Sequence, residues 1–162
     1  MSPRRYYRPR STRPKQRYSV ENIVKDLIVD VDTTSTTIYQ RQGIQDVVPA
    51  DFSNIPRKVS HIHLHFDHDN FNFVWALVYV PASYSPNYLG LTSDSPNLYN
   101  PNQFLMGSGY VNANTAGGQN NFTVPLKRIL HSGDNIRLII AADTINTSTT
   151  LTFAARYAIT AL

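Results

Sequence analysis

Two neighbouring segments of the chain carry hydrophobic patterns that predict β-strands. In the first, residues 57–66, hydrophobic side chains and histidines alternate, so that they fall on opposite faces: Ile62, Leu64 and Phe66 against His61, His63 and His65. The second, residues 71–80, is apolar on both faces, which is typical of a strand covered twice, by its own core and by another layer or subunit. Because a short turn at residues 67–70 joins them, we expect the two segments to form a hairpin.

Weaker patterns predict further strands on both sides. Residues 22–32 favour a strand, although the hydrophobic spacing behind Ser19 also fits a helix. The β-branched, polar residues that follow predict an edge strand around Thr36–Gln42. Downstream we expect extended segments separated by loops and by a tight turn at 132–134: Gln103–Val111, Phe122–Leu130, 135–142 and Thr150–Leu162.

About eight strands and no secure helix predict an all-β fold. Eight strands with long connections fit an eight-stranded antiparallel jelly roll of two packed sheets better than an immunoglobulin-like sandwich of about seven strands. We expect one domain over residues 18–162, preceded by an arm over residues 1–17. The long connection at 81–102 is rich in proline and tyrosine, and its tyrosines are candidates for a subunit interface: Tyr84, Tyr88 and Tyr99.

The amino-terminal arm differs from the rest of the chain in composition. It holds seven cations and no carboxylate: Arg4, Arg5, Arg8, Arg10, Arg13, Lys15 and Arg17. Prolines interrupt it and no hydrophobic period is present, so we expect it to be disordered or extended when alone. Tyr6 and Tyr7 lie among the arginines, where aromatic rings can stack on unpaired bases while the cations contact phosphates. A solubilising tail or a nuclear-import signal are the alternatives.

Charge is divided unevenly between the arm and the body. Residues 18–162 carry eight Lys/Arg against eleven Asp/Glu, a formal charge of −3, whereas residues 1–17 carry +7. A cationic arm on a mildly acidic body is typical of a protein that binds a polyanion. The chain has no cysteine, which excludes disulfides and thiolate metal sites. No apolar run reaches the length of a membrane span, and we expect neither a membrane partner nor secretion through an amino-terminal signal.

Three segments together resemble a known family of proteins. The arginine-rich arm continues into RYSVEN (17–22), a basic-apolar stretch precedes a Gly-Asp turn in KRILHSGDNIRLII (127–140), and the chain closes on ARYAIT (155–160). In their order, and in the size of the chain, these features resemble the capsid (coat) proteins of small circular Rep-encoding single-stranded DNA viruses, the circovirus-like assemblage. The match covers both ends of the chain well and its middle poorly.

This resemblance implies a jelly roll that self-assembles into the smallest icosahedral, T=1-like shell, of roughly sixty copies. It implies no enzymatic activity and no cofactor, a location in the virion, and assembly in the host nucleus. The arms would line the interior and bind the single-stranded DNA genome; small satellite RNA viruses use a similar plan, so RNA remains an alternative. A monomeric cellular nucleic-acid-binding β protein is the second interpretation.

The histidines at period two suggest other chemistry as well. Side chains of His61, His63 and His65 emerge from one strand face and could converge on a metal ion. His63 and His65 also resemble the paired His-x-His of cupins, although Asp69 would replace the usual Glu and no second motif follows. In a jelly roll with an apolar interior, however, these histidines lie on the outer face of a sheet, where their protonation near pH ~6.5 could make assembly sensitive to pH.

Overall fold

The computed structural model describes residues 18–29, 42–67, 71–83, 91–92, 95–96, 104–112, 120–142 and 147–162. Within these ranges the regular structure is entirely β. Nine strands build two antiparallel sheets: β1 (Ser19–Val29), β2 (Gln42–Val48), β3 (Arg57–Asp67), β4 (Phe73–Val80), β7 (Leu105–Val111), β8 (Asn121–Val124), β9 (Arg128–Leu130), β10 (Asn135–Ala142) and β11 (Thr149–Ala161). Two short strands, β5 (Leu91–Thr92) and β6 (Ser95–Pro96), pair with each other.

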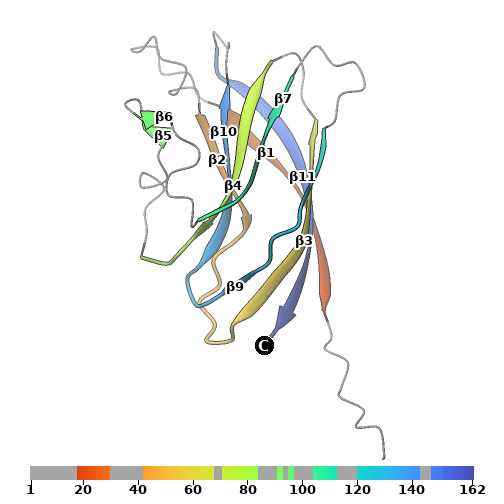
Figure 1. The fold of residues 1–162 in the computed structure, drawn as a ribbon, viewed down its shortest axis with the longest axis vertical. Coiled ribbons are helices and arrows are strands. Elements are labelled where there is room, and N and C mark those ends of the chain that lie inside the picture. Colours follow the sequence, from red (N-terminus) through yellow and green to blue (C-terminus); the bar gives the residue numbers. More distant parts are fainter. Residues whose placement is uncertain are drawn as a thin grey trace, which may run out of the picture.

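The order of the strands defines a jelly roll. Sheet A has the order β1-β11-β3-β8, with β9 also paired to β3, and sheet B has the order β2-β10-β4-β7. The first strand therefore pairs with the last, the second with the last but one, and so on inwards, as in a long hairpin folded over into two sheets. Figure 1 shows the two sheets packed face to face. Because β8 and β9 pair with successive parts of β3, they occupy one position, and eight positions result. The predicted jelly roll is confirmed.

Most of the predicted strands are present, but one predicted pairing is wrong. Strands β3 and β4 lie in different sheets, where β3 pairs with β11, β8 and β9, and β4 pairs with β10 and β7. They do not form a hairpin, because the connection after β3 crosses from one sheet to the other. The segment 22–32 forms a strand through Val29, as favoured over a helix. Residues 36–41 lie outside the described residues, and β2 begins at Gln42, further along than expected, so that Val47 and Val48 enter the core.

Apolar side chains from both sheets fill the space between them. An aromatic cluster joins the sheets, in which Trp75 of sheet B lies against Phe122 of sheet A at a centroid distance of 4.9 Å, and Phe66 meets Phe73 edge-on at 5.3 Å. Strand β4 is buried on both faces, as its sequence predicts. Its second face belongs to a smaller cluster within the same chain: Ala76, Val78, Val80, Phe104 and Ile139.

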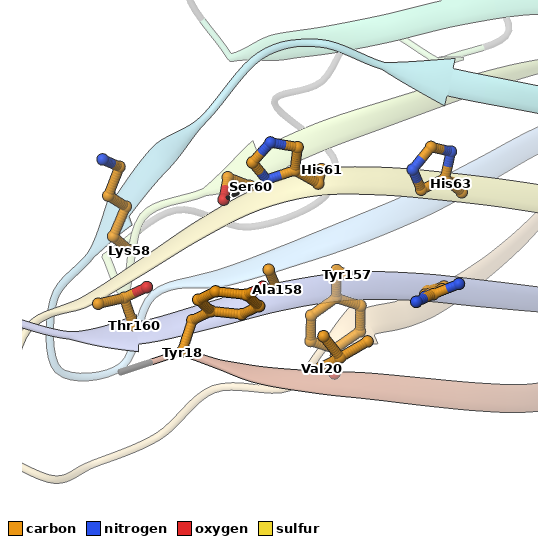
Figure 2. A pocket seen from close by; sticks show the side chains of 10 residues that line it. Tyr18, Val20, Lys58, Ser60, His61, His63, Tyr157, Ala158 and Thr160 are labelled. Atoms are coloured by element: carbon orange, nitrogen blue, oxygen red, sulfur yellow. Dashed lines mark hydrogen bonds between the residues drawn. The ribbon is translucent and has the colours of Figure 1, made fainter. Parts of the chain in front are cut away.

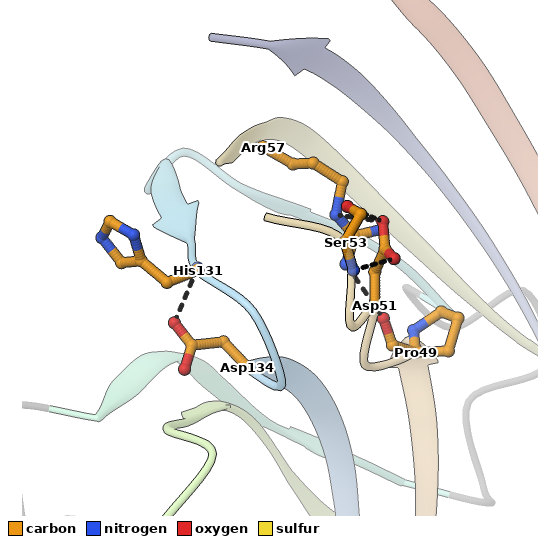
Figure 3. A network of polar contacts seen from close by, with 6 residues as sticks. All are labelled: Pro49, Asp51, Ser53, Arg57, His131 and Asp134. Atoms are coloured by element: carbon orange, nitrogen blue, oxygen red, sulfur yellow. Dashed lines mark hydrogen bonds and ion pairs between the residues drawn. The ribbon is translucent and has the colours of Figure 1, made fainter. Parts of the chain in front are cut away.

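A polar network ties the loops together at the end of the sandwich where β1 begins. The Asp51 carboxylate accepts hydrogen bonds from the Ser53 amide at 2.9 Å and the Ser53 hydroxyl at 3.0 Å, which together hold the pKa of Asp51 below its ordinary value. Arg57 lies 3.4 Å from the same carboxylate (Figure 3). The Gly133 amide donates to the Asp51 carbonyl, so this loop also holds the turn before β10. Gly133 adopts a φ of 84°, which suits glycine.

Candidate nucleic-acid interface

The outward-facing histidines are positioned by a bulge in β3. Val59 and Ile62 are both fully buried, although strict alternation would place residues three apart on opposite faces. The pairing with β11 accounts for this, since Ala158 faces Ser60 and Arg156 faces His63, leaving two residues of β3 opposite Tyr157 alone. His61 is the extra residue, and its φ of 54° lies in the left-handed region. Because of this extra residue, the apolar side chains on both sides of the bulge point into the core, namely Val59, Ile62, Leu64 and Phe66.

The three predicted histidines lie on the outer face of sheet A, as expected for an apolar interior. All three side chains are exposed. Each Nδ1 has a different neighbour: the Ser60 hydroxyl for His61 at 3.0 Å, the Thr123 hydroxyl for His63 at 3.0 Å, and the Asn121 amide oxygen for His65 at 2.9 Å. Within the described part of the chain, no group of three His, Cys, Asp or Glu residues could hold a metal ion. The histidines therefore line a surface and do not converge on one point.

Three adjoining hollows follow β3 along this face. The largest, about 540 Å³, lies between β1, β11 and β3, and we call it the Tyr18 hollow (Figure 2). Its lining is Tyr18, Val20, Lys58, Ser60, His61, His63, Arg156, Tyr157, Ala158 and Thr160. A second hollow of about 380 Å³ extends towards β8 and Lys127, and a third of about 230 Å³ extends towards His65 and Asn121. His63 lines all three, so they form one continuous surface.

The lining of these hollows is cationic and contains no carboxylate among the described residues. Tyr157 closes part of the floor, and burial raises the pKa of its hydroxyl, with a further contribution from the Glu21 carboxylate. The hydroxyl therefore stays neutral at ordinary pH. Cations and imidazoles set among neutral hydroxyl and apolar groups favour an anionic ligand.

The cations of the body divide into two groups. Four of the described ones already have partners: Lys25 donates to the Asp46 carbonyl, Arg137 bonds the Asp46 carboxylate at 2.7 Å, Arg57 pairs with Asp51, and Arg128 lies over the Tyr79 ring. Lys58, Lys127 and Arg156 make no ion pair with any described residue, and all three line the hollows of sheet A. The unpaired positive charge of the described body is therefore gathered on one face.

The predicted site residues of the arm lie outside the described residues, as do the interface candidates Tyr84, Tyr88 and Tyr99. The described chain begins at Tyr18, which is 67% exposed and lines the largest hollow, so the arm is covalently joined to the edge of the cationic face. Sequence reasoning missed Lys58, Lys127 and Arg156 as a group. Lys58 lies on β3, Arg156 on β11 and Lys127 in the connection between β8 and β9, and only the strand order of the jelly roll brings them together.

No protein-family model matches the chain, and no curated protein matches it. Similarity is found to solved virus structures. A chain of the Israeli acute paralysis virus full particle heated to 63 degrees has 12% identity, with 99% of this chain and 85% of that chain covered, at a TM-score of 0.36. A chain of the native virion of Kashmir bee virus at neutral pH has 13% identity and a TM-score of 0.39, with 99% of this chain and 84% of that chain covered. A chain of Desmodium yellow mottle tymovirus has 12% identity and a TM-score of 0.35, with 100% of this chain and 94% of that chain covered.

These TM-scores are too low to assign this chain to the family of any of these proteins. The jelly roll is defined by the strand order of the chain itself. None of the described residues forms a helix long and apolar enough to span a membrane.

Proposed function

We propose that this chain is a viral coat protein that self-assembles into a small closed shell and encloses single-stranded nucleic acid. In this proposal the shell is T=1-like, with roughly sixty copies. The genome is single-stranded DNA, and the mature location is the virion. Assembly takes place in the host nucleus, for which an arginine-rich arm has a suitable composition.

One observation carries the proposal: the unpaired cations of the described body all line one face, and the arm begins at the edge of that same face. Seven further cations in residues 4–17 precede Tyr18 in the sequence, and Tyr18 lines this surface, which already favours anions. Phosphate contacts of this kind are independent of base sequence, which suits a protein that must enclose a whole genome. The outer face of sheet A therefore faces the interior of the shell.

The jelly roll is compatible with this function, since viral capsids use it widely, but lectins and cupins use it too. The fold alone therefore does not decide between them. The histidines do not favour the cupin-type metalloprotein, because each imidazole contacts a separate neighbour on an exposed surface. A monomeric nucleic-acid-binding protein would use the same cationic face, and it is distinguished from a coat protein by its assembly state.

Particle size and nucleic-acid content test the proposal together. We expect the purified full-length chain to form closed particles by light scattering and negative-stain imaging, with an ultraviolet absorbance ratio that reports packaged nucleic acid. Deletion of residues 1–17 is expected to leave the fold intact and to reduce the packaged nucleic acid. A variant with every arm arginine replaced by lysine keeps the charge and serves as the control. A full-length chain that stays monomeric would refute the coat-protein assignment.

A further inference from the structure

The Tyr18 hollow has the size and the composition of a ligand site. Its volume of about 540 Å³ falls within the range of roughly 300–1,000 Å³ that small-molecule sites occupy. Figure 2 shows that its side chains come from neighbouring segments, with Tyr18 directly before β1, Val20 on β1, Ala158 on β11, and His61 and His63 on β3. Because strand pairing fixes the backbones of β1, β11 and β3, the walls that these strands supply are held in place before any ligand binds. Tyr18 directly precedes Ser19, the first paired residue of β1.

The two sides of the hollow offer different chemistry. Tyr18, Val20 and Ala158 supply an aromatic ring and apolar carbon, whereas Lys58 and Arg156 supply positive charge and the imidazoles supply polar ring nitrogens. A free phosphate would use only the second group. A ligand that uses both has a flat, largely apolar part and an attached anion, which describes a nucleotide. The exposed ring of Tyr18 is available as a stacking surface, and aromatic stacking accepts any base.

The spacing of Lys58 and Arg156 indicates how a single strand of nucleic acid would lie across the hollow. In the pairing of β11 with β3, Lys58 faces Thr160, while Arg156 lies four residues earlier on β11, opposite His63. Four residues of extended backbone span roughly 13 Å, and the long Lys and Arg side chains can bring their charged groups closer together than this. The two cations can therefore contact successive phosphates, one on either side of a single nucleotide.

The bulge at His61 contributes directly to the hollow. Both Ser60 and His61 line it, because the additional residue allows two consecutive side chains to reach the same side of β3. A histidine at a positive φ is uncommon and costs conformational energy, and such costs are concentrated at functional sites. Here the bulge places an imidazole beside the Tyr18 hollow.

We propose that the Tyr18 hollow binds one unpaired nucleotide of a single strand, with the base stacked on Tyr18 and the adjacent phosphates on Lys58 and Arg156. This inference rests on the proposed function and adds to it a preference for unpaired bases. In a duplex each base is covered by its stacked neighbours, so it cannot offer a free face to Tyr18. The arm contacts phosphates of either form.

Affinity for short oligonucleotides tests the preference. Fluorescence anisotropy would compare a thymidine pentanucleotide with a G·C-rich hairpin duplex of five base pairs closed by a non-nucleotide linker, using the full-length chain in salt high enough to weaken the phosphate contacts of the arm. We expect Tyr18→Leu to lose about 5- to 150-fold in affinity for the single strand, the loss that corresponds to one stacked base, and to change little for the duplex. Tyr18→Phe retains the ring and is the matched control.

Ultraviolet crosslinking of the wild-type chain to the same pentanucleotide gives an independent measurement. Trypsin releases residues 18–25 as one peptide and residues 42–57, which begin with β2 of the opposite sheet and do not line the hollow, as another. We expect the nucleotide adduct on the first peptide and none on the second. Equal affinities for Tyr18→Leu and Tyr18→Phe, or no adduct on residues 18–25, would overturn the inference.

Two further outcomes also count against the nucleotide site. An equal loss for single strand and duplex would assign Tyr18 to phosphate binding alone. Polyglutamate would be added as a competitor at an equal concentration of negative charge. If it displaced the pentanucleotide and abolished the crosslinks to residues 18–25, the result would indicate an acidic peptide as the ligand. The proposed function has its own test, which does not depend on Tyr18. It would be refuted if the wild-type chain formed no particles that contain nucleic acid.

Discussion

Tyr79 donates a hydrogen bond of 2.7 Å to the carboxylate of Asp134 and so joins the centre of sheet B to the turn between the two sheets. Asp134 is only 4% exposed, and its carboxylate also accepts from the Ala82 amide at 3.1 Å and the His131 amide at 2.8 Å. Figure 3 shows the last of these bonds. Three donors thus compensate for the burial of one charge, which fixes the turn that leads into β10.

Replacement of Asp134 by alanine is therefore expected to destabilise the fold strongly. The substitution leaves two backbone amides and one hydroxyl without an acceptor, for a loss of about 3 to 5 kcal/mol in the free energy of unfolding. Urea denaturation followed by circular dichroism would measure it. Ser132→Ala, an exposed neighbour in the same turn, is the control and is expected to change the free energy by less than about 0.5 kcal/mol. Similar stabilities for the two variants would contradict the network.

The same hydrogen bond predicts a pH dependence at high pH. Burial, followed by the hydrogen bond to Asp134, raises the pKa of Tyr79 from 10.0 to about 12. Since the folded pKa exceeds the unfolded one, this stabilisation is fully present below pH 10 and is lost as the pH rises from 10 towards 12. Urea midpoints measured across this range should fall more steeply for the wild type than for Tyr79→Phe. Parallel curves would show that the hydroxyl does not titrate in this way.

The bulge in β3 predicts that two histidines of one strand respond differently to the same substitution. His61 has a φ of 54°, which a β-branched residue adopts only with strain, so His61→Val is expected to cost about 1 to 3 kcal/mol. His63 does not share this conformation, and valine suits an extended strand, so His63→Val should cost less than about 1 kcal/mol. Thermal unfolding of both variants would decide. If they lose equal stability, β3 is regular in solution.

His61→Gly separates backbone strain from loss of the imidazole. Glycine accepts the left-handed conformation, so this variant should remain within about 1 kcal/mol of the wild type although it lacks the side chain. A loss as large as that of His61→Val would assign the cost to the missing imidazole and its contact with Ser60.

The sequence predicted strands better than it predicted their pairing. Alternation is a local signal, and it correctly identified the buried face of β3 and the doubly buried β4. Pairing depends on residues far apart in the chain, and for this reason the hairpin expected for β3 and β4 is absent. The bulge at His61 could not be seen as such, because Ile62 to Phe66 continue the same alternation on one side of it. The spacing of two apolar residues, Val59 and Ile62, three positions apart was the available signal, and both are buried.

The candidate site was only partly predictable for the same reason. The charge of the arm is a property of composition, so it could be read without a fold. Lys58 and Arg156 are distant in the sequence and have unremarkable neighbours, and they share a hollow only because β3 and β11 pair. The period of the histidines pointed to the correct face, but the cations beside them could be added only from the three-dimensional arrangement.

The cationic face makes a quantitative prediction about salt dependence. If Lys58, Lys127 and Arg156 contact phosphates, their combined replacement by glutamine removes three contacts, each of which contributes about 0.7 to the slope of log affinity against log salt for a single strand. We expect the slope for a long single strand to become shallower by about 2. These side chains make no ion pairs with described residues, so the fold should be unaffected. The charge-preserving variant Lys58→Arg, Lys127→Arg, Arg156→Lys is the control and should keep the wild-type slope. An unchanged slope in the glutamine variant would place all phosphate contacts in the arm and would remove the outer face of sheet A from the interface.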